Sequence, residues 1–398
     1  MPQDSSFPPF SRRSFLSMSA AASATAAFGI VTEPMLAWAE QKPPFSKDAV
    51  MINSNENPLG PSRAALEAMS AILPTGGRYQ WELTASLEKT FAEMQGVKPD
   101  YVVSFPGSSG PLHYTVLAYT SPSKSYVTAD PGYEAGMHAA KVSGARVVKV
   151  GLTKTNAHDV KAMLAAAPDA GVFYICTPNN PTGTLTPHSD IEYLLANKPK
   201  GSIVLVDEAY IHFSDASSAI DLVKADKDVI LLRTFSKIYG MAGLRCGFAI
   251  GRPDLLSRIS QLHGWNAMPV TAVVAAVASL KDSALVSERK QINASVRQET
   301  FEWLDRNRYS YIPSVANFFL LDTGRPAKYT IDAMAHQDVF IGRNWPVMPS
   351  YVRVTVGTRP EMEKFQAAFK KVMDGTAVGR LTPPRVVPET LDGLMVRG

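Results

Sequence analysis

The fold is decided by the stretch RTFSKIYGMAGLRCGF, residues 233–248, which overlaps two apolar, strand-like runs at 229–233 and 246–250. It carries one lysine, Lys237, with the hydroxyl side chains of Thr234 and Ser236, the guanidinium of Arg245 and three glycines. A lysine in a glycine-containing loop is usually a surface residue. A functional assignment therefore needs support from the rest of the chain.

The chemistry of these side chains points to one cofactor. An amine such as that of Lys237 forms a Schiff base with an aldehyde, and Thr234, Ser236 and Arg245 can hold a phosphate. Pyridoxal 5'-phosphate carries both groups, and enzymes that use it anchor it through a lysine. The stretch therefore predicts a pyridoxal-phosphate site at Lys237.

Strand-like and helical segments alternate through most of the chain. The apolar runs are short, rich in β-branched or aromatic residues and bounded by turn residues: 101–105, 125–129, 146–150, 172–176, 203–207, 229–233 and 246–250. Helical patterns lie between many of them, at 111–119, 133–142, 160–166 and 191–196. Such alternation predicts an α/β fold with a mostly parallel seven-stranded sheet between helices. Ligands bind beyond the carboxyl ends of such strands, which is where Lys237 lies.

A smaller α+β domain is expected at the C-terminus. A long helical pattern with few breakers, 270–308, leads to strand-like runs at 318–321 and 352–356 and to a final helix at 360–373. The tail after Gly375 is rich in proline and arginine and shows no periodicity. The expected division is a leader at 1–39, a segment joining the small domain at 40–75, a large cofactor-binding domain at 76–290 and a small domain at 291–398.

The N-terminus resembles an export signal. SRRSFL, residues 11–16, is similar to a twin-arginine (Tat) signal, and an Ala- and Ser-rich apolar stretch follows to about residue 31. AWA, residues 37–39, is a small-x-small cleavage pattern, so we expect cleavage after Ala39 and a periplasmic or secreted protein. The alternatives are a membrane anchor and an unfolded tail; the apolar stretch is short for an anchor.

Composition excludes several other classes. The 398 residues carry a formal net charge of +4 with lysine and arginine dispersed, which argues against a nucleic-acid groove or an anionic-membrane surface. The 45% hydrophobic content and the length suit two globular domains. The only cysteines, Cys176 and Cys246, lie in apolar runs and are expected to be small buried residues rather than a disulfide. We expect no bound metal.

Three further motifs follow predicted strands. DEAY, residues 207–210, places Asp207 at a buried strand end, where a carboxylate needs a partner such as a pyridinium nitrogen. Tyr210, expected one helical turn later, could reach the ring hydroxyl. The alternative for Asp207 is a helix N-cap.

CTPNNPTG, residues 176–183, is a rigid turn that can aim one amide, or simply a tight turn. FPGSSG, residues 105–110, offers amides at a helix N-terminus for a phosphate, although many strand-to-helix turns look alike.

The ordered series of motifs resembles one family. Its segments are NENPLGP (55–61), GSS (107–109), DPGY (130–133), NPTG (180–183), DEAY (207–210), SK (236–237), GLRCGF (243–248) and VRVTVG (352–357). The series resembles the class I and II aminotransferases of pyridoxal-phosphate fold type I, above all the histidinol-phosphate aminotransferase branch. The resemblance covers nearly the whole chain after the leader.

The resemblance implies a role for each matching residue. Lys237 would hold the cofactor as an aldimine, Asp207 would pair with the pyridinium nitrogen, and Tyr133 would stack on the ring. Asn180 and Tyr210 would bond the ring hydroxyl oxygen. The phosphate would be held by a group of hydroxyl and cationic side chains, Ser108, Ser109, Thr234, Ser236 and Arg245.

The resemblance also implies substrates and an assembly. Tyr79 would reach the cofactor phosphate of a partner subunit, giving a homodimer with shared active sites. Arg353, with Arg343 as a second contact, would bind an anionic group of the substrate, and the loop around Asn55 would close over the site. A ping-pong transfer from an amino acid or related amine to a 2-oxo acid is expected, with Lys237 as the general base and Asp207 and Tyr210 beside it.

Two departures from the branch bear on the substrate. The phosphate turn is PGSSGP where the branch has Gly-Asn-Gly, and Arg78-Tyr79 is followed by Gln80 rather than proline. The export signal also places the protein away from cytoplasmic histidine synthesis. Oxidase, lyase or cyclase chemistry on the same scaffold is an alternative, as is a non-catalytic pyridoxal-phosphate-binding module.

Overall fold

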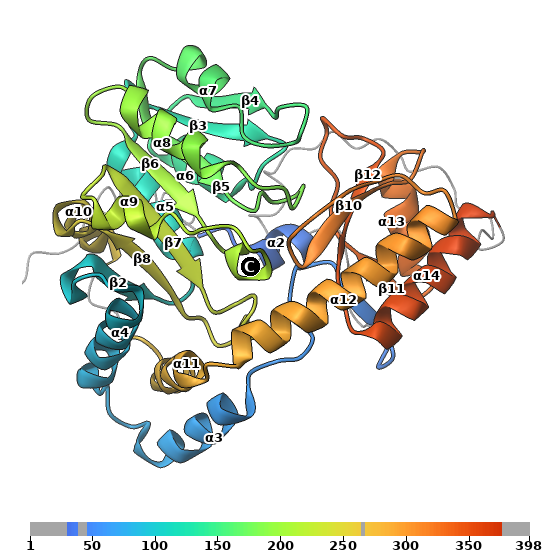
Figure 1. Cartoon of the computed structure of the whole chain (residues 1–398), viewed down its shortest axis with the longest axis horizontal. Coiled ribbons are helices and arrows are strands. Elements are labelled where there is room, and N and C mark those ends of the chain that lie inside the picture. The colour runs from blue at the N-terminus through green and yellow to red at the C-terminus, as the bar shows by residue number, and fades with distance from the viewer. Residues whose placement is uncertain (1–29, 39–45, 264–266, 376–398) are drawn as a thin grey trace, which may run out of the picture.

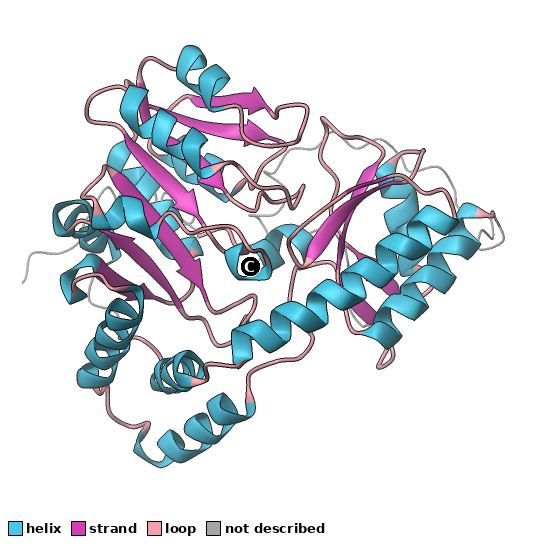
Figure 2. Cartoon of the chain, viewed as in Figure 1, coloured by secondary structure: helices cyan, strands magenta, loops and turns pink. Residues whose placement is uncertain are grey.

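The computed structural model describes residues 30–38, 46–263 and 267–375 (Figure 1). The twin-arginine motif, most of the apolar stretch after it, Ala39 and the tail from residue 376 lie outside the described residues. Two bodies, each built of helices and strands, make up the described chain, and helices cover their sheets (Figure 2).

A seven-stranded sheet forms the larger body. Its strands are β2 (Val102–Phe105), β8 (Gly247–Gly251), β7 (Val229–Thr234), β6 (Ile203–Asp207), β5 (Ala170–Cys176), β3 (Ser125–Asp130) and β4 (Val147–Gly151), in that order. All neighbours are parallel except β8, which is antiparallel to β2 and to β7. The predicted mostly parallel sheet is confirmed, and the seven apolar runs predicted its strands to within two residues.

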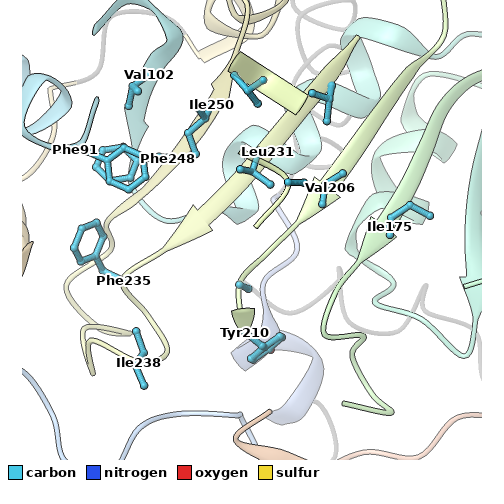
Figure 3. Packing of buried hydrophobic residues seen from close by; sticks show 14 of the residues in the cluster. Phe91, Val102, Ile175, Val206, Tyr210, Leu231, Phe235, Ile238, Phe248 and Ile250 are labelled. Atoms are coloured by element: carbon cyan, nitrogen blue, oxygen red, sulfur yellow. The ribbon is translucent and has the colours of Figure 1, made fainter. Parts of the chain in front are cut away.

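The central strands are apolar along most of their length because helices bury both faces of the sheet. Side chains alternate between the faces: Phe173 and Ile175 belong to one apolar cluster, and Val172 and Tyr174 to the other. Figure 3 shows part of the first cluster.

The helices divide between the two faces of the large sheet. The first cluster receives residues from α3 (Arg63–Ile72), α4 (Trp81–Gln95), α7 (Val160–Ala166), α8 (His188–Asn197), α9 (Ile220–Lys224) and α11 (Val270–Lys281). The second receives residues from α5 (Ser109–Tyr119), α6 (Ala135–Val142) and α10 (Pro253–His263). The short 3-10 helix η1 (Leu73–Thr75) follows α3, and a second one, η2 (Pro99–Tyr101), precedes β2.

The smaller body contains two short sheets. One has the order β12 (Tyr351–Thr355), β10 (Phe318–Asp322), β9 (Tyr311–Ile312); the other pairs β1 (Val50–Ile52) in parallel with β11 (Val339–Ile341). Helices α12 (Leu285–Arg306), α13 (Ala327–Ala335) and α14 (Arg359–Met373) pack with them. Residues 50–52 thus join the C-terminal body, whereas α3, which also lies in the segment 40–75, contributes Ala65 to the apolar cluster of the large sheet.

The helical pattern at 270–308 forms two helices rather than one. α11 ends at Lys281 and α12 begins at Leu285, with an angle of 84° between them. The break lies at Asp282-Ser283-Ala284, where Asp282 accepts a hydrogen bond from the backbone N–H of Ala284. Aspartate and serine compete with helical hydrogen bonds in this way. Within the described residues no single helix is both long and apolar enough to cross a membrane.

Candidate active site

Ten predicted site residues line one pocket at the carboxyl edge of the large sheet. They are Ser108, Ser109, Tyr133, Asn180, Asp207, Tyr210, Thr234, Ser236, Lys237 and Arg245. The parallel strands β5, β6 and β7 end together here, because Cys176 is in register with Asp207 and Asp207 with Leu232. The motifs that follow these strands therefore converge although they are far apart in sequence.

Lys237 lies in the loop between β7 and β8 with its amine inside the protein. Only 8% of the residue is exposed. Its Nζ donates hydrogen bonds to the carbonyl oxygens of Asn55, at 3.0 Å, and of Ser54, at 3.4 Å. Burial lowers the pKa of Lys237 to about 8. An appreciable fraction of this amine is therefore neutral near physiological pH, as a nucleophile or base must be.

Asp207 is buried at the end of β6 with neutral hydrogen-bond donors. Its Oδ2 accepts from the Tyr174 hydroxyl at 2.9 Å, and its Oδ1 accepts from the backbone N–H of Ala209 at 3.1 Å. Burial raises the pKa of Asp207 to about 6. A buried carboxylate with these donors lacks a full counter-charge, and the pyridinium nitrogen of pyridoxal phosphate fits that need.

Tyr210 reaches the pocket through a turn, and the prediction that it lies one helical turn after Asp207 is wrong. The short 3-10 helix η3 (Ile211–Phe213) begins only after Tyr210. The reason is that Asp207 Oδ1 caps the turn through Ala209, while Glu208 turns away to form a buried ion pair with Arg233 at 2.7 Å. The Tyr210 hydroxyl accepts a hydrogen bond from Asn55 Nδ2 at 3.1 Å.

Asn55 lies next to the pocket, between the lining residues Ser54 and Glu56, and bonds Tyr210 and Lys237. It is fully buried with a φ of 54°, in the left-handed region that asparagine tolerates. Its backbone N–H donates to Thr355 Oγ1 at 3.0 Å, and its carbonyl oxygen accepts from Asn317 Nδ2 at 3.1 Å as well as from Lys237. The loop around Asn55 therefore ties the small body to the lysine.

Hydroxyl groups and a guanidinium gather at the start of α5 and form a cradle suited to a phosphate. Ser109 is the first residue of α5 and Ser108 its N-cap. Arg245 Nη1 donates to Ser236 Oγ at 3.1 Å, and Thr234 Oγ1 donates to the same oxygen at 3.0 Å. A helix N-terminus with such donors binds phosphate readily.

Gly107 lets Arg245 lie across this helix start. Its φ is 87°, and a Cβ placed there would come within 2.1 Å of Arg245 Nη2. Only glycine fits both the backbone conformation and the space. The cradle fits the phosphate of the predicted cofactor.

The two predicted substrate-binding arginines lie at one side of the pocket. Arg353 on β12 is fully buried; its Nη1 donates to Asn180 Oδ1 and its Nη2 to the carbonyl oxygen of Asn53, both at 2.8 Å. Arg343 Nη1 donates to Glu134 Oε2 at 3.0 Å. Asn180 therefore links the arginine to the turn at 176–183.

Tyr79 is the one predicted site residue that lies apart from the pocket. It is 74% exposed and stacks on Trp81, with 5.9 Å between ring centroids. The contact of Tyr79 with the cofactor phosphate of a partner subunit stays a prediction. Cys176 and Cys246 are both buried and unpaired, as expected.

Sequence reasoning missed two polar residues of the site. Tyr174 lies in the apolar strand β5, two residues before Cys176, which is in register with Asp207. This spacing is the only sequence signal that puts Tyr174 on the same face of the sheet as Asp207. Glu33 lines the pocket and pairs with both arginines, yet the export-signal interpretation assigned it to the leader. Among the described residues, no group of three or more His, Cys, Asp or Glu side chains could hold a metal ion.

Known proteins share this sequence and arrangement. The family Aminotransferase class I and II matches residues 47–369. A histidinol-phosphate aminotransferase of Moorella thermoacetica is 32% identical over 340 residues, which is 82% of this chain and 86% of the relative. An aromatic amino acid aminotransferase of Cutibacterium acnes is 32% identical over 333 residues, 83% of this chain and 94% of the relative.

A solved structure has the same fold. The histidinol-phosphate aminotransferase of Sinorhizobium meliloti in complex with pyridoxal-5'-phosphate has a TM-score of 0.78 and 24% identity. The match covers 94% of this chain and 99% of that one.

Proposed function

The chain belongs to the class I and II aminotransferases and is a pyridoxal-phosphate-dependent aminotransferase, and we propose that it works outside the cytoplasm as a homodimer on an anionic amino compound. The observation that carries the substrate proposal is the fully buried Arg353 beside the pocket of Lys237 and Asp207. The donor would be an amino acid or a related amine such as histidinol phosphate, and the acceptor a 2-oxo acid.

The cofactor, when bound, supplies an electrophilic carbon and an electron-accepting ring. Asp207, lacking a full counter-charge in the chain, would hold the proton on the ring nitrogen. Tyr210, oriented by Asn55, would donate a hydrogen bond to the ring hydroxyl oxygen. Ser108, Ser109, Thr234, Ser236 and Arg245 would hold the phosphate.

Lys237 Nζ would move the substrate's α-proton. Its lowered pKa, about 8, lets the amine accept a proton and return it without a large energetic penalty in either direction. The carbonyl oxygens of Ser54 and Asn55 orient this amine when it is not attached to the cofactor.

Arg353 limits the substrate to compounds with an anionic group. A guanidinium binds carboxylate or phosphate through two parallel hydrogen bonds, so it selects the charge and leaves the rest of the substrate open. The PGSSGP phosphate turn and Gln80 after Tyr79 separate this chain from the histidinol-phosphate pattern. For this reason the donor would include amino compounds other than histidinol phosphate.

A homodimer is supported by the surface around Tyr79. Tyr79 and Trp81 are exposed beside Leu73, which is 63% exposed, so one short segment presents three large apolar side chains. Tyr79 would contact the cofactor phosphate of the partner subunit.

Export is supported by SRRSFL at 11–16 and AWA at 37–39. A Tat substrate crosses the membrane folded, which suits a protein that acquires its cofactor in the cytoplasm. N-terminal sequencing of the exported form should give a start at Glu40; a start at Met1 would exclude cleavage.

A spectral titration tests the reaction. The purified holoprotein should show an absorbance band that shifts on addition of the true amino donor and returns on addition of a 2-oxo acid. A panel of amino acids, histidinol phosphate included, identifies the donor. A shift that no 2-oxo acid reverses would argue against transamination of that compound.

A further inference from the structure

Glu33 lies in the pocket, in contact with the side chains assigned to the substrate's anionic group. Its Oε1 accepts a hydrogen bond from Arg353 Nη2 at 2.5 Å, and its Oε2 lies 3.5 Å from Arg343 Nη2. Asn180 Nδ2 donates to the same Oε2 at 3.2 Å. One carboxylate thus engages two arginines and an amide.

The short helix α2 (Glu33–Trp38) brings Glu33 to this position. Figure 1 shows α2 between the large sheet and the strands β10 and β12. The backbone N–H of Val31 donates to His113 Nε2 at 3.2 Å. Val31 and Leu36 pack against the apolar cluster of α5 and α6, and Ala37 is buried. The segment is therefore docked through apolar contacts as well as through its charge.

The electrostatics show why a carboxylate is held here. Burial alone would raise the pKa of Glu33, but Arg343 and Arg353 outweigh it and lower that pKa to about 2. The other described acceptors of the Arg353 Nη atoms are neutral, the Asn180 amide and the Asn53 carbonyl. Glu33 thus supplies the negative charge that this buried cation needs.

We propose that Glu33 is an internal competitor of the substrate, which keeps the anion subsite of Arg353 and Arg343 filled while residues 30–38 remain attached. The inference rests on the proposed function in two respects: the arginines bind the substrate's anionic group, and cleavage after Ala39 removes α2 together with Glu33. The uncleaved protein would then be folded but weak in substrate binding, and processing would open the subsite.

Binding of an unreactive dicarboxylate tests this directly. Maleate is titrated by calorimetry into full-length holoprotein, as wild type and as Glu33→Gln, which removes the charge and keeps the size. Leu36→Asp is a second variant, which undocks the segment by placing a charge against the apolar cluster without changing the arginines. Glu67→Gln is the matched control, since the described ion pair of Glu67 is with the exposed Arg63.

Glu33→Gln and Leu36→Asp should bind maleate about 10- to 100-fold more tightly than wild type, as expected for release of a charged hydrogen-bonded pair. Glu67→Gln should match wild type. Equal affinity in wild type, Glu33→Gln and Leu36→Asp would overturn the competition while leaving the anion subsite intact. Absence of maleate binding in all four proteins would overturn the subsite itself, and with it the proposed role of Arg353.

Discussion

Replacing Asp207 by asparagine should change how the stability of the cofactor-free protein depends on pH. In the folded chain the carboxylate is buried and receives hydrogen bonds from Tyr174 and Ala209. Its pKa is raised from an ordinary 3.8 to about 6. Asparagine keeps an oxygen for the Ala209 N–H and carries no charge, so this source of pH dependence disappears.

The sign and size follow from the two pKa values. The pKa of Asp207 is higher in the folded protein than in the unfolded chain, so folding favours the protonated carboxyl group. The folded wild type is therefore most stable with respect to this group below pH 3.8, and it loses stability as the pH rises through 6. The loss between pH 4 and pH 8 is roughly 2 kcal/mol. Other titrating groups cancel when wild type is compared with Asp207→Asn.

The measurement is urea unfolding of both cofactor-free proteins at pH 4, 6 and 8. Asp207→Asn should gain roughly 2 kcal/mol relative to wild type across that range. Tyr174→Phe removes a hydrogen bond to the carboxylate, so it should enlarge the pH-dependent loss. Saturating cofactor should reverse the advantage of the variant, since the ring nitrogen then compensates the Asp207 charge. A difference that does not change with pH would refute the reasoning.

Three further substitutions separate anchoring, substrate binding and phosphate binding. Lys237→Ala should abolish covalent cofactor attachment, seen after borohydride reduction as loss of cofactor mass on the denatured protein, and reduce turnover by at least about 100-fold; retained attachment would exclude Lys237 as the anchor. Arg353→Lys, in protein lacking the leader, should raise KM for the anionic donor about 10- to 100-fold with little change in cofactor affinity, because lysine cannot form two parallel hydrogen bonds; an unchanged KM would contradict the assignment. Gly107→Ala should weaken cofactor binding about tenfold or more, because its Cβ displaces Arg245; equilibrium dialysis that gives wild-type affinity would show that Arg245 is dispensable.

The sheet could be predicted from the sequence because its strands are buried on both faces. A run such as 203–207, IVLVD, is apolar up to its last residue and is followed by a turn, so its type and its end are both evident. The same property located Asp207, which is the last residue of β6, and Lys237, which follows the end of β7. The antiparallel direction of β8 could not be inferred from its own residues, since a buried strand has the same composition in either direction.

The errors arose where local hydrogen bonds override a general pattern. Tyr210 was expected in a helix, but Asp207 caps a turn and Glu208 pairs with Arg233. The pattern at 270–308 is interrupted at Asp282, whose side chain bonds the backbone that would continue the helix. Neither Asp207 nor Asp282 stands out in the sequence, because its effect on the backbone depends on the geometry of its side chain.

Glu33 shows a different limit. Its sequence context is that of a leader, and a leader is set aside before the fold is considered. Its contacts with Arg353, Arg343 and Asn180 depend on residues more than a hundred positions away. A local motif cannot reveal such a contact, whereas the structure places the carboxylate in the pocket.

The most direct test of the central claim is the stoichiometry of the half-reaction. Holoprotein lacking the leader is mixed with the amino donor found by titration, without a 2-oxo acid. A transaminase should release about one oxo product per active site and then stop, because the amino group stays on the cofactor. Addition of a 2-oxo acid should restart it. Continued turnover without an acceptor, with release of ammonia or consumption of oxygen, would contradict the assignment of this site as an aminotransferase.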